Sequence, residues 1–210
     1  MPSNAYRRSA GSAALAAAVT TFVYSVAFVV VTPAAPHAGR TLAALCLGLG
    51  AIFSTAVLVG IYEAVREIDP AKALWGLLLG IIGAAGALVH GGYDLAVAVG
   101  PASGAGVPAG ALSPVDPRGL LTFGASGVGL AVLAGLMAQT SSGSRAGAFP
   151  GPLAGLGYLL AVLEIILYVG RLLIVTPANP LIVVPALLAG FVVGPAWYLW
   201  LGVVFRRARA

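Results

Sequence analysis

Long apolar runs, separated by short polar or Gly/Pro-containing stretches, cover most of this 210-residue chain. A helix needs about 20 residues to cross the hydrocarbon core of a bilayer, and six runs reach that length. Three runs are preceded by Asp-Pro or Asn-Pro, which is typical of helix starts: Asp69-Pro70, Asp116-Pro117 and Asn179-Pro180. We therefore predict an all-α bundle of six transmembrane helices in a single domain, over residues 10–32, 41–62, 71–98, 118–139, 152–175 and 180–205.

The composition excludes a water-soluble globule, because 60% of the residues are hydrophobic and only 8% are charged. The first run could instead be a signal peptide, since Arg7 and Arg8 precede it and Pro36-His37-Ala38 loosely resembles a cleavage site. Its apolar core is longer than that of a usual signal peptide. We expect a retained helix.

The positive charges are divided unevenly between the two ends of the predicted helices. Eight lie at the end that holds both termini: Arg7, Arg8, Arg66, Lys72, Arg145, Arg206, Arg207 and Arg209. The other end has only Arg40, Arg118 and Arg171. Cytoplasmic loops carry the excess of cations, so both termini are predicted to be cytoplasmic. The preference for Arg over Lys hints at a GC-rich bacterial genome, and we expect the bacterial plasma membrane.

Aromatic residues near the same predicted boundary support this orientation. Trp75, Trp197, Trp200 and Tyr62 are interpreted as interfacial anchors. The cations are scattered rather than clustered on one face, which argues against nucleic acid as a partner. On the opposite side, residues 100–118 are rich in Gly, Pro, Ala and Ser and predict a flexible outer loop. The predicted partners are membrane lipid and, as open alternatives, a homo-oligomer or a larger membrane complex.

Glu164 and Arg171 are the only charged residues in the run 152–175. Their spacing of seven places them on one helical face, with Tyr168 between them. Two turns separate them by about 10 Å, too far for a direct contact. Because a charge in hydrocarbon is costly, Glu164 should face the bundle interior and either be protonated or bind a donor there. It is a candidate proton or ligand site.

His90 and Asp94 form a second polar cluster, one helical turn apart in the run 71–98. Asp94 is predicted at about the depth of Arg171, which makes it the best partner for that cation. We expect these residues to line an outward-facing cavity: His90, Asp94, Tyr168 and Arg171, with Glu164 at its floor. The alternative is that His90 and Asp94 simply contact water and lipid headgroups. Gly91-Gly92 could also end or distort the helix here.

The segment Gly124-Ala125-Ser126-Gly127 resembles the nucleophile motif of rhomboid intramembrane proteases, which also have six core helices. The resemblance implies that Ser126 is a nucleophile with a histidine on the sixth helix as its base. Here the run 180–205 contains no histidine, and a hydroxyl without a base is a poor nucleophile. We interpret the segment as small residues at a helix contact.

Other chemistries lack the necessary residues. A retinal Schiff base needs a lysine within the membrane, and the only lysine, Lys72, is at the boundary. Haem ligation would depend on His37 and His90 alone, and His37 lies in a loop sequence. Cys46 is the single cysteine. We therefore predict no cofactor, no metal and no catalytic residue.

Two stretches resemble an uncharacterised bacterial family of six-helix integral membrane proteins of about this length. The first is VGIYEAVREIDPAKALWGLLLGIIGAAGAL at 59–88, and the second is AFPGPLAGLGYLLAVLE at 148–164. The resemblance implies a six-helix fold and a membrane location, and it carries no activity.

Three functional hypotheses follow from these residues. The first is a non-enzymatic membrane protein that binds a small or lipophilic ligand, or a partner's transmembrane helix, through the outward-facing polar cavity. The second is a small proton-coupled transporter that uses Glu164. The third is a degenerate rhomboid-like serine hydrolase that uses Ser126.

Overall fold

The computed structural model describes residues 4–100, 121–142, 149–173 and 178–207, and it is all-α within them. The first long helix comprises α1 (Asn4–Val26), the π-helical segment η1 (Ala27–Val31) and α2 (Thr32–Ala34). The others are listed in chain order: α3 (Pro36–Val65), α4 (Pro70–Val99), η2 (Leu121–Ala125) with α6 (Ser126–Ser142), α7 (Gly151–Leu173), and α8 (Pro180–Leu187) with η3 (Leu188–Val193) and α9 (Gly194–Arg207). These form six helices long and apolar enough to span a membrane, which confirms the predicted fold class.

Two of the three predicted helix starts lie in the described residues, and both are capped as expected. The Asp69 carboxylate accepts a hydrogen bond from the backbone N–H of Lys72 at 3.0 Å, ahead of α4. The Asn179 side chain accepts one from the backbone N–H of Leu181 at 3.0 Å, ahead of α8. The Asp116-Pro117 start and the predicted loop 100–118, apart from Gly100, fall outside the described residues.

The Asp69 cap predicts a pH-dependent contribution to stability. Its hydrogen bond from the Lys72 backbone, supported by the Lys72 ammonium at 3.2 Å, lowers the pKa of the Asp69 carboxyl. A lowered native pKa stabilises the fold above the unfolded-state pKa, and the effect is lost as the pH falls through the native pKa. We expect Asp69→Ala to lower the unfolding temperature at neutral pH and to match the wild type in strong acid. Thermal unfolding in detergent at several pH values measures this effect. The control is Asn179→Ala, which removes an uncharged cap and should lower the unfolding temperature by the same amount at every pH.

Wide π-helical turns precede two of the prolines. The backbone N–H of Thr32 bonds to the Ala27 carbonyl just before Pro33, and that of Gly194 bonds to the Ala189 carbonyl just before Pro195. A proline ring clashes with the helical carbonyl four residues earlier, and a wider turn moves that carbonyl aside. The helix therefore continues past each proline, by one residue after Pro33 and as far as Arg207 after Pro195, where η3 joins α8 to α9.

Close packing of glycines brings the helices together. A methyl group placed on Gly129 of α6 would lie 2.7 Å from the backbone nitrogen of Gly80 in α4. One placed on Gly202 of α9 would lie 3.1 Å from the Gly11 carbonyl of α1. Membrane helices have no hydrophobic driving force to associate in lipid, so close backbone packing holds them together. Glycine at these positions is what permits that packing.

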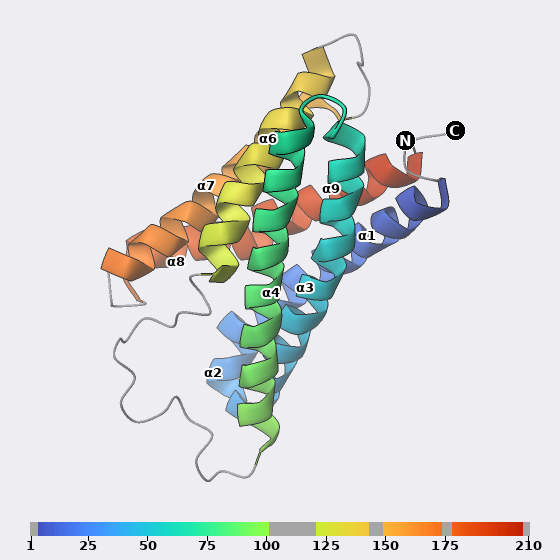
Figure 1. Ribbon diagram of the computed structural model, residues 1–210. Coiled ribbons are helices and arrows are strands. Elements are labelled where there is room, and N and C mark those ends of the chain that lie inside the picture. The colour runs from blue at the N-terminus through green and yellow to red at the C-terminus, as the bar shows by residue number, and fades with distance from the viewer. Residues whose placement is uncertain (1–3, 101–120, 143–148, 174–177, 208–210) are drawn as a thin grey trace.

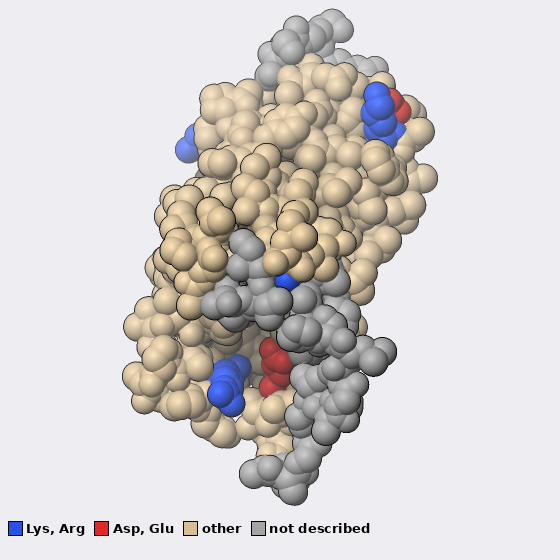
Figure 2. Space-filling model, turned by 90° about the vertical axis from the view of Figure 1, so that its left-hand side faces the viewer, with Lys and Arg blue, Asp and Glu red and all other residues tan. Residues whose placement is uncertain are grey.

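The two ends of the molecule differ in charge. Both termini and the turn between α3 and α4 lie at the same end (Figure 1). The cations at this end are Arg7, Arg8, Arg66, Lys72, Arg206 and Arg207, whereas Arg40 and Arg171 are at the other end of the described chain. On the face shown in Figure 2, most charged side chains lie toward the two ends of the molecule. The broad area between them is uncharged except for one small spot of Lys or Arg. This is the surface expected of a membrane-spanning bundle.

Candidate functional site

Glu164 lies near the middle of α7, and its carboxylate is inside the bundle. Its Oε2 atom is buried and has no hydrogen-bond partner among the described residues. Almost all buried polar groups in proteins are paired, and an unpaired one destabilises the fold. The position of Glu164 therefore favours a role other than stability.

The Glu164 side chain lines a cavity of about 50 Å³ between the helices. Five helices contribute to it: α3 with Ser54 and Leu58, α4 with Gly80, α6 with Ser126 and Leu130, α7 with Leu160 and Glu164, and α9 with Trp197 and Tyr198. This volume exceeds the roughly 10–15 Å³ that one water molecule requires. We call this space the Glu164 cavity.

Three hydroxyl groups accompany the carboxylate around the cavity. Ser54 Oγ donates to the Ala51 carbonyl at 2.8 Å, which leaves its lone pairs available. The second hydroxyl belongs to Tyr198 of α9, which lines the same cavity. The third hydroxyl belongs to Ser126. An occupant that donates to the carboxylate would therefore also find hydroxyl partners.

Ser126 reaches the cavity because α4 and α6 pack closely beside it. A methyl group on Gly83 of α4 would overlap the Ser126 hydroxyl. The neighbouring glycines pack against α7, where Gly124 contacts the Tyr168 ring and Gly127 lies against Ala161 and Glu164. This arrangement supports the helix-contact interpretation of the Gly-Ala-Ser-Gly segment. No histidine is among the residues that line the Glu164 cavity.

Trp197 is a buried residue of this region, with only 2% of its surface exposed. Its ring makes an edge contact with Tyr198, with centroids 5.0 Å apart. The indole nitrogen has no hydrogen-bond partner among the described residues and lies against Gly157 of α7. Its interpretation as an interfacial anchor was wrong, because an anchor would be exposed at the membrane boundary. By contrast, Trp75 is 54% exposed.

The other predicted site residues lie toward the opposite end of the bundle from the termini. His90 Nε2 and the Asp94 carboxylate are 3.1 Å apart, as their spacing on α4 predicts. The helix continues through Gly91-Gly92 to Val99, so these glycines do not end it. Arg171 is in the last turn of α7.

The Glu164 cavity is not lined by His90, Asp94, Tyr168 or Arg171. The single outward-facing cavity that joins all five residues therefore stays a prediction. Sequence reasoning identified Glu164 but missed Ser54, Trp197 and Tyr198. Ser54 gave a weak signal, because with Thr55 it forms a short polar interruption in an apolar run. The two aromatic residues gave none, because they are also common at membrane boundaries.

Within the described part of the chain, no three residues of the His, Cys, Asp or Glu types lie together as metal ligands would. Comparisons with protein-family models, with curated proteins and with solved structures give no match. The helices themselves indicate a multi-pass membrane protein in contact with lipid. A function must therefore be argued from the Glu164 cavity and from the His90–Asp94 pair.

Proposed function

We propose that this protein is a small proton-coupled membrane transporter and that Glu164 is its proton-binding residue. The observation that carries the proposal is the unpartnered, buried Oε2 of Glu164 beside an internal cavity. Intramembrane carboxylic acids are rare, and they commonly mark ion pathways and proton relays. A carboxyl group without a fixed partner can exchange a proton without breaking a structural hydrogen bond.

The arrangement of helices around the cavity supports transport over simple ligand storage. Transporters bind their coupling ions near the bilayer midplane, between helices with irregular backbone. The Glu164 cavity has five helices around it, and two of them follow π-helical segments: η2 ends immediately before Ser126, and η3 precedes α9. Such wide turns are frequent at functional sites. Small rotations of these helices would open the cavity toward one side.

The location and orientation belong to the same proposal. We place the protein in a bacterial plasma membrane with both termini in the cytoplasm. The excess of described cations at the end that holds the termini supports this orientation. The resemblance of residues 59–88 and 148–164 to an uncharacterised six-helix family is consistent with the same placement.

A second candidate function is ligand binding at the outer end of the bundle. The observation in its favour is the 3.1 Å contact between His90 and Asp94, whose side chains are 24% and 43% exposed. A small ligand or a partner's helix that binds there should bind less tightly to Asp94→Asn, whereas Glu164→Gln should leave the binding unchanged. If the protein is instead a proton-coupled transporter, Glu164→Gln should have the larger effect on its activity and Asp94→Asn the smaller one.

Infrared difference spectroscopy tests whether Glu164 exchanges a proton. We expect the protein in lipid to show a carboxylic C=O band that changes with pH and disappears in Glu164→Gln. The matched control is Glu63→Gln, since Glu63 forms a partly exposed ion pair with Arg66 at 3.2 Å near the helix end. A spectrum in which Glu164→Gln retains the band would contradict the proposal.

A further inference from the structure

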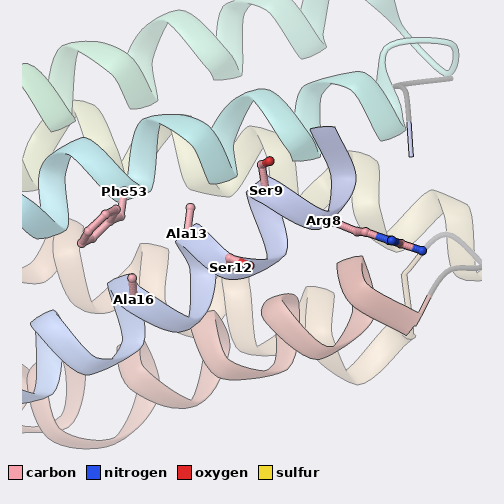
Figure 3. Close-up of a pocket in the computed structure, with 6 residues that line it drawn as sticks. All are labelled: Arg8, Ser9, Ser12, Ala13, Ala16 and Phe53. Carbon is pink, nitrogen blue, oxygen red and sulfur yellow. The ribbon is translucent and has the colours of Figure 1, made fainter. Parts of the chain in front are cut away.

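A groove follows α1 on the surface of the bundle, far along the chain from Glu164. It has a volume of about 560 Å³ and is lined by Arg8, Ser9, Ser12, Ala13 and Ala16 of α1 and by Phe53 of α3. Figure 3 shows five of these residues along successive turns of α1, from Arg8 to Ala16, with Phe53 on the neighbouring helix α3. From Arg8 to Ala16, the helix rises by about 12 Å. The groove thus extends from the helix end into the membrane-spanning part.

The inner part of the groove is apolar and shallow because its side chains are small. Ala13 and Ala16 leave space beside α1, and the Phe53 ring forms a wall of that space. No hydrogen-bonding side chain lines this inner part. A flexible hydrocarbon chain fits such a space, because apolar packing needs no directional partner.

The end of the groove nearest the chain termini is polar and cationic. Arg8 is exposed there, Ser9 is the next residue along α1, and Ser12 lies one turn further. The Arg206 side chain of α9 packs beside the same turn, with its Cγ 2.7 Å from a methyl group placed on Gly11. Arg8 is therefore the arginine that lines this end of the groove, whereas Arg206 packs against the same part of α1 without lining the groove. Guanidinium groups are strong partners for phosphate, which they can bind through two hydrogen bonds.

We propose that this groove binds an anionic phospholipid. The Arg8 guanidinium holds the phosphate, and one acyl chain lies along Ala13, Ala16 and Phe53. The groove has a cationic end near the chain termini and an apolar part within the membrane-spanning region. This division matches the division of a phospholipid into headgroup and acyl chain. This site is independent of Glu164 and of proton transfer.

A second copy of the chain fits the groove less well than a lipid. Small residues at Ser9, Ala13 and Ala16 would permit close helix packing. In a two-fold symmetric pair through α1, however, each Arg8 would lie at the same depth as the Arg8 of the other copy, and like charges would meet. A phosphate group offers the opposite charge at that position. Charge complementarity therefore favours the lipid.

Native mass spectrometry of the purified protein tests the proposal with phosphatidylglycerol and phosphatidylcholine of identical acyl chains. We expect the wild type to retain phosphatidylglycerol preferentially. Arg8→Gln should lower its affinity about fivefold and remove the preference, as expected for one cation near an anionic headgroup. The control is Arg66→Gln, because Arg66 is an exposed cation at the same end of the bundle but outside the groove. Equal losses in both variants would show a general charge effect and overturn the proposal.

The apolar part of the groove is tested by Ala16→Leu, which fills the space beside Phe53. We expect this variant to lose both lipids, whereas Ala85→Leu, at an exposed position on α4, should retain them. Full retention of lipid by Ala16→Leu would overturn the proposed position of the acyl chain. A dimeric mass that disappears in Ala16→Leu would assign the groove to a second copy instead.

Discussion

Gly91→Ala is expected to destabilise the protein by about 1–3 kcal/mol, the usual cost of forcing an extra carbon into a close-packed site. Gly91 is buried where α4 crosses α3. A methyl group there would lie 2.8 Å from both the Ala44 carbonyl oxygen and the Gly48 backbone nitrogen. Backbone atoms cannot rotate away as a side chain can, so the two helices would have to separate. A larger residue such as valine should prevent folding.

The adjacent Gly92 supplies the control for this prediction. A methyl group at Gly92 meets no atom within 4 Å, although the residue is on the same helix at almost the same depth. Gly92→Ala should be neutral or stabilising by up to about 1 kcal/mol, because alanine is the better helix former. Thermal unfolding in detergent, followed by circular dichroism, compares the two variants. Equal unfolding temperatures in the two variants would show that the α3–α4 contact does not require a glycine at Gly91.

The six helices could be predicted because hydropathy and helix starts depend on local sequence. Asp69 and Asn179 cap their helices through hydrogen bonds within three residues along the chain. The bilayer also fixes the minimum length of each span. Neither signal requires knowledge of the neighbouring helices. The sequence therefore predicted the secondary structure and the membrane class.

The side that each helix turns toward the bundle was much harder to predict. A helix that is apolar all round has no polar face to show which side is buried. Trp197 shows the difficulty, since it is 2% exposed, whereas Trp200, three residues later, is 37% exposed. Hydropathy does not distinguish these two tryptophans. The lining of the Glu164 cavity depends on the orientation of five helices, and only Glu164 was marked by its charge.

Glu164→Gln is expected to abolish proton-coupled transport while leaving the fold intact. Glutamine has nearly the same shape and keeps an oxygen acceptor, and Glu164 Oε2 has no hydrogen bond among the described residues to lose. The unfolding temperature should therefore stay close to that of the wild type. The amide cannot bind and release a proton near neutral pH, so a carrier that depends on this step should stop. Glu164→Gln should therefore lose its transport activity without losing stability.

The measurement uses proteoliposomes that contain a pH-sensitive dye, to which a panel of small solutes is added in turn. The wild type should show a change of internal pH with at least one solute, and Glu164→Gln should reduce its rate at least about 100-fold, within the range attributed to a positioned proton-transfer group. Glu63→Gln should transport normally, because its carboxylate lies near the helix end beside Arg66. Ser126→Ala should also transport protons, whereas a serine hydrolase would lose its activity with that hydroxyl. Solute-dependent proton movement that persists in Glu164→Gln would move the coupling site away from the cavity, and His90 with Asp94 would then be the next pair to test.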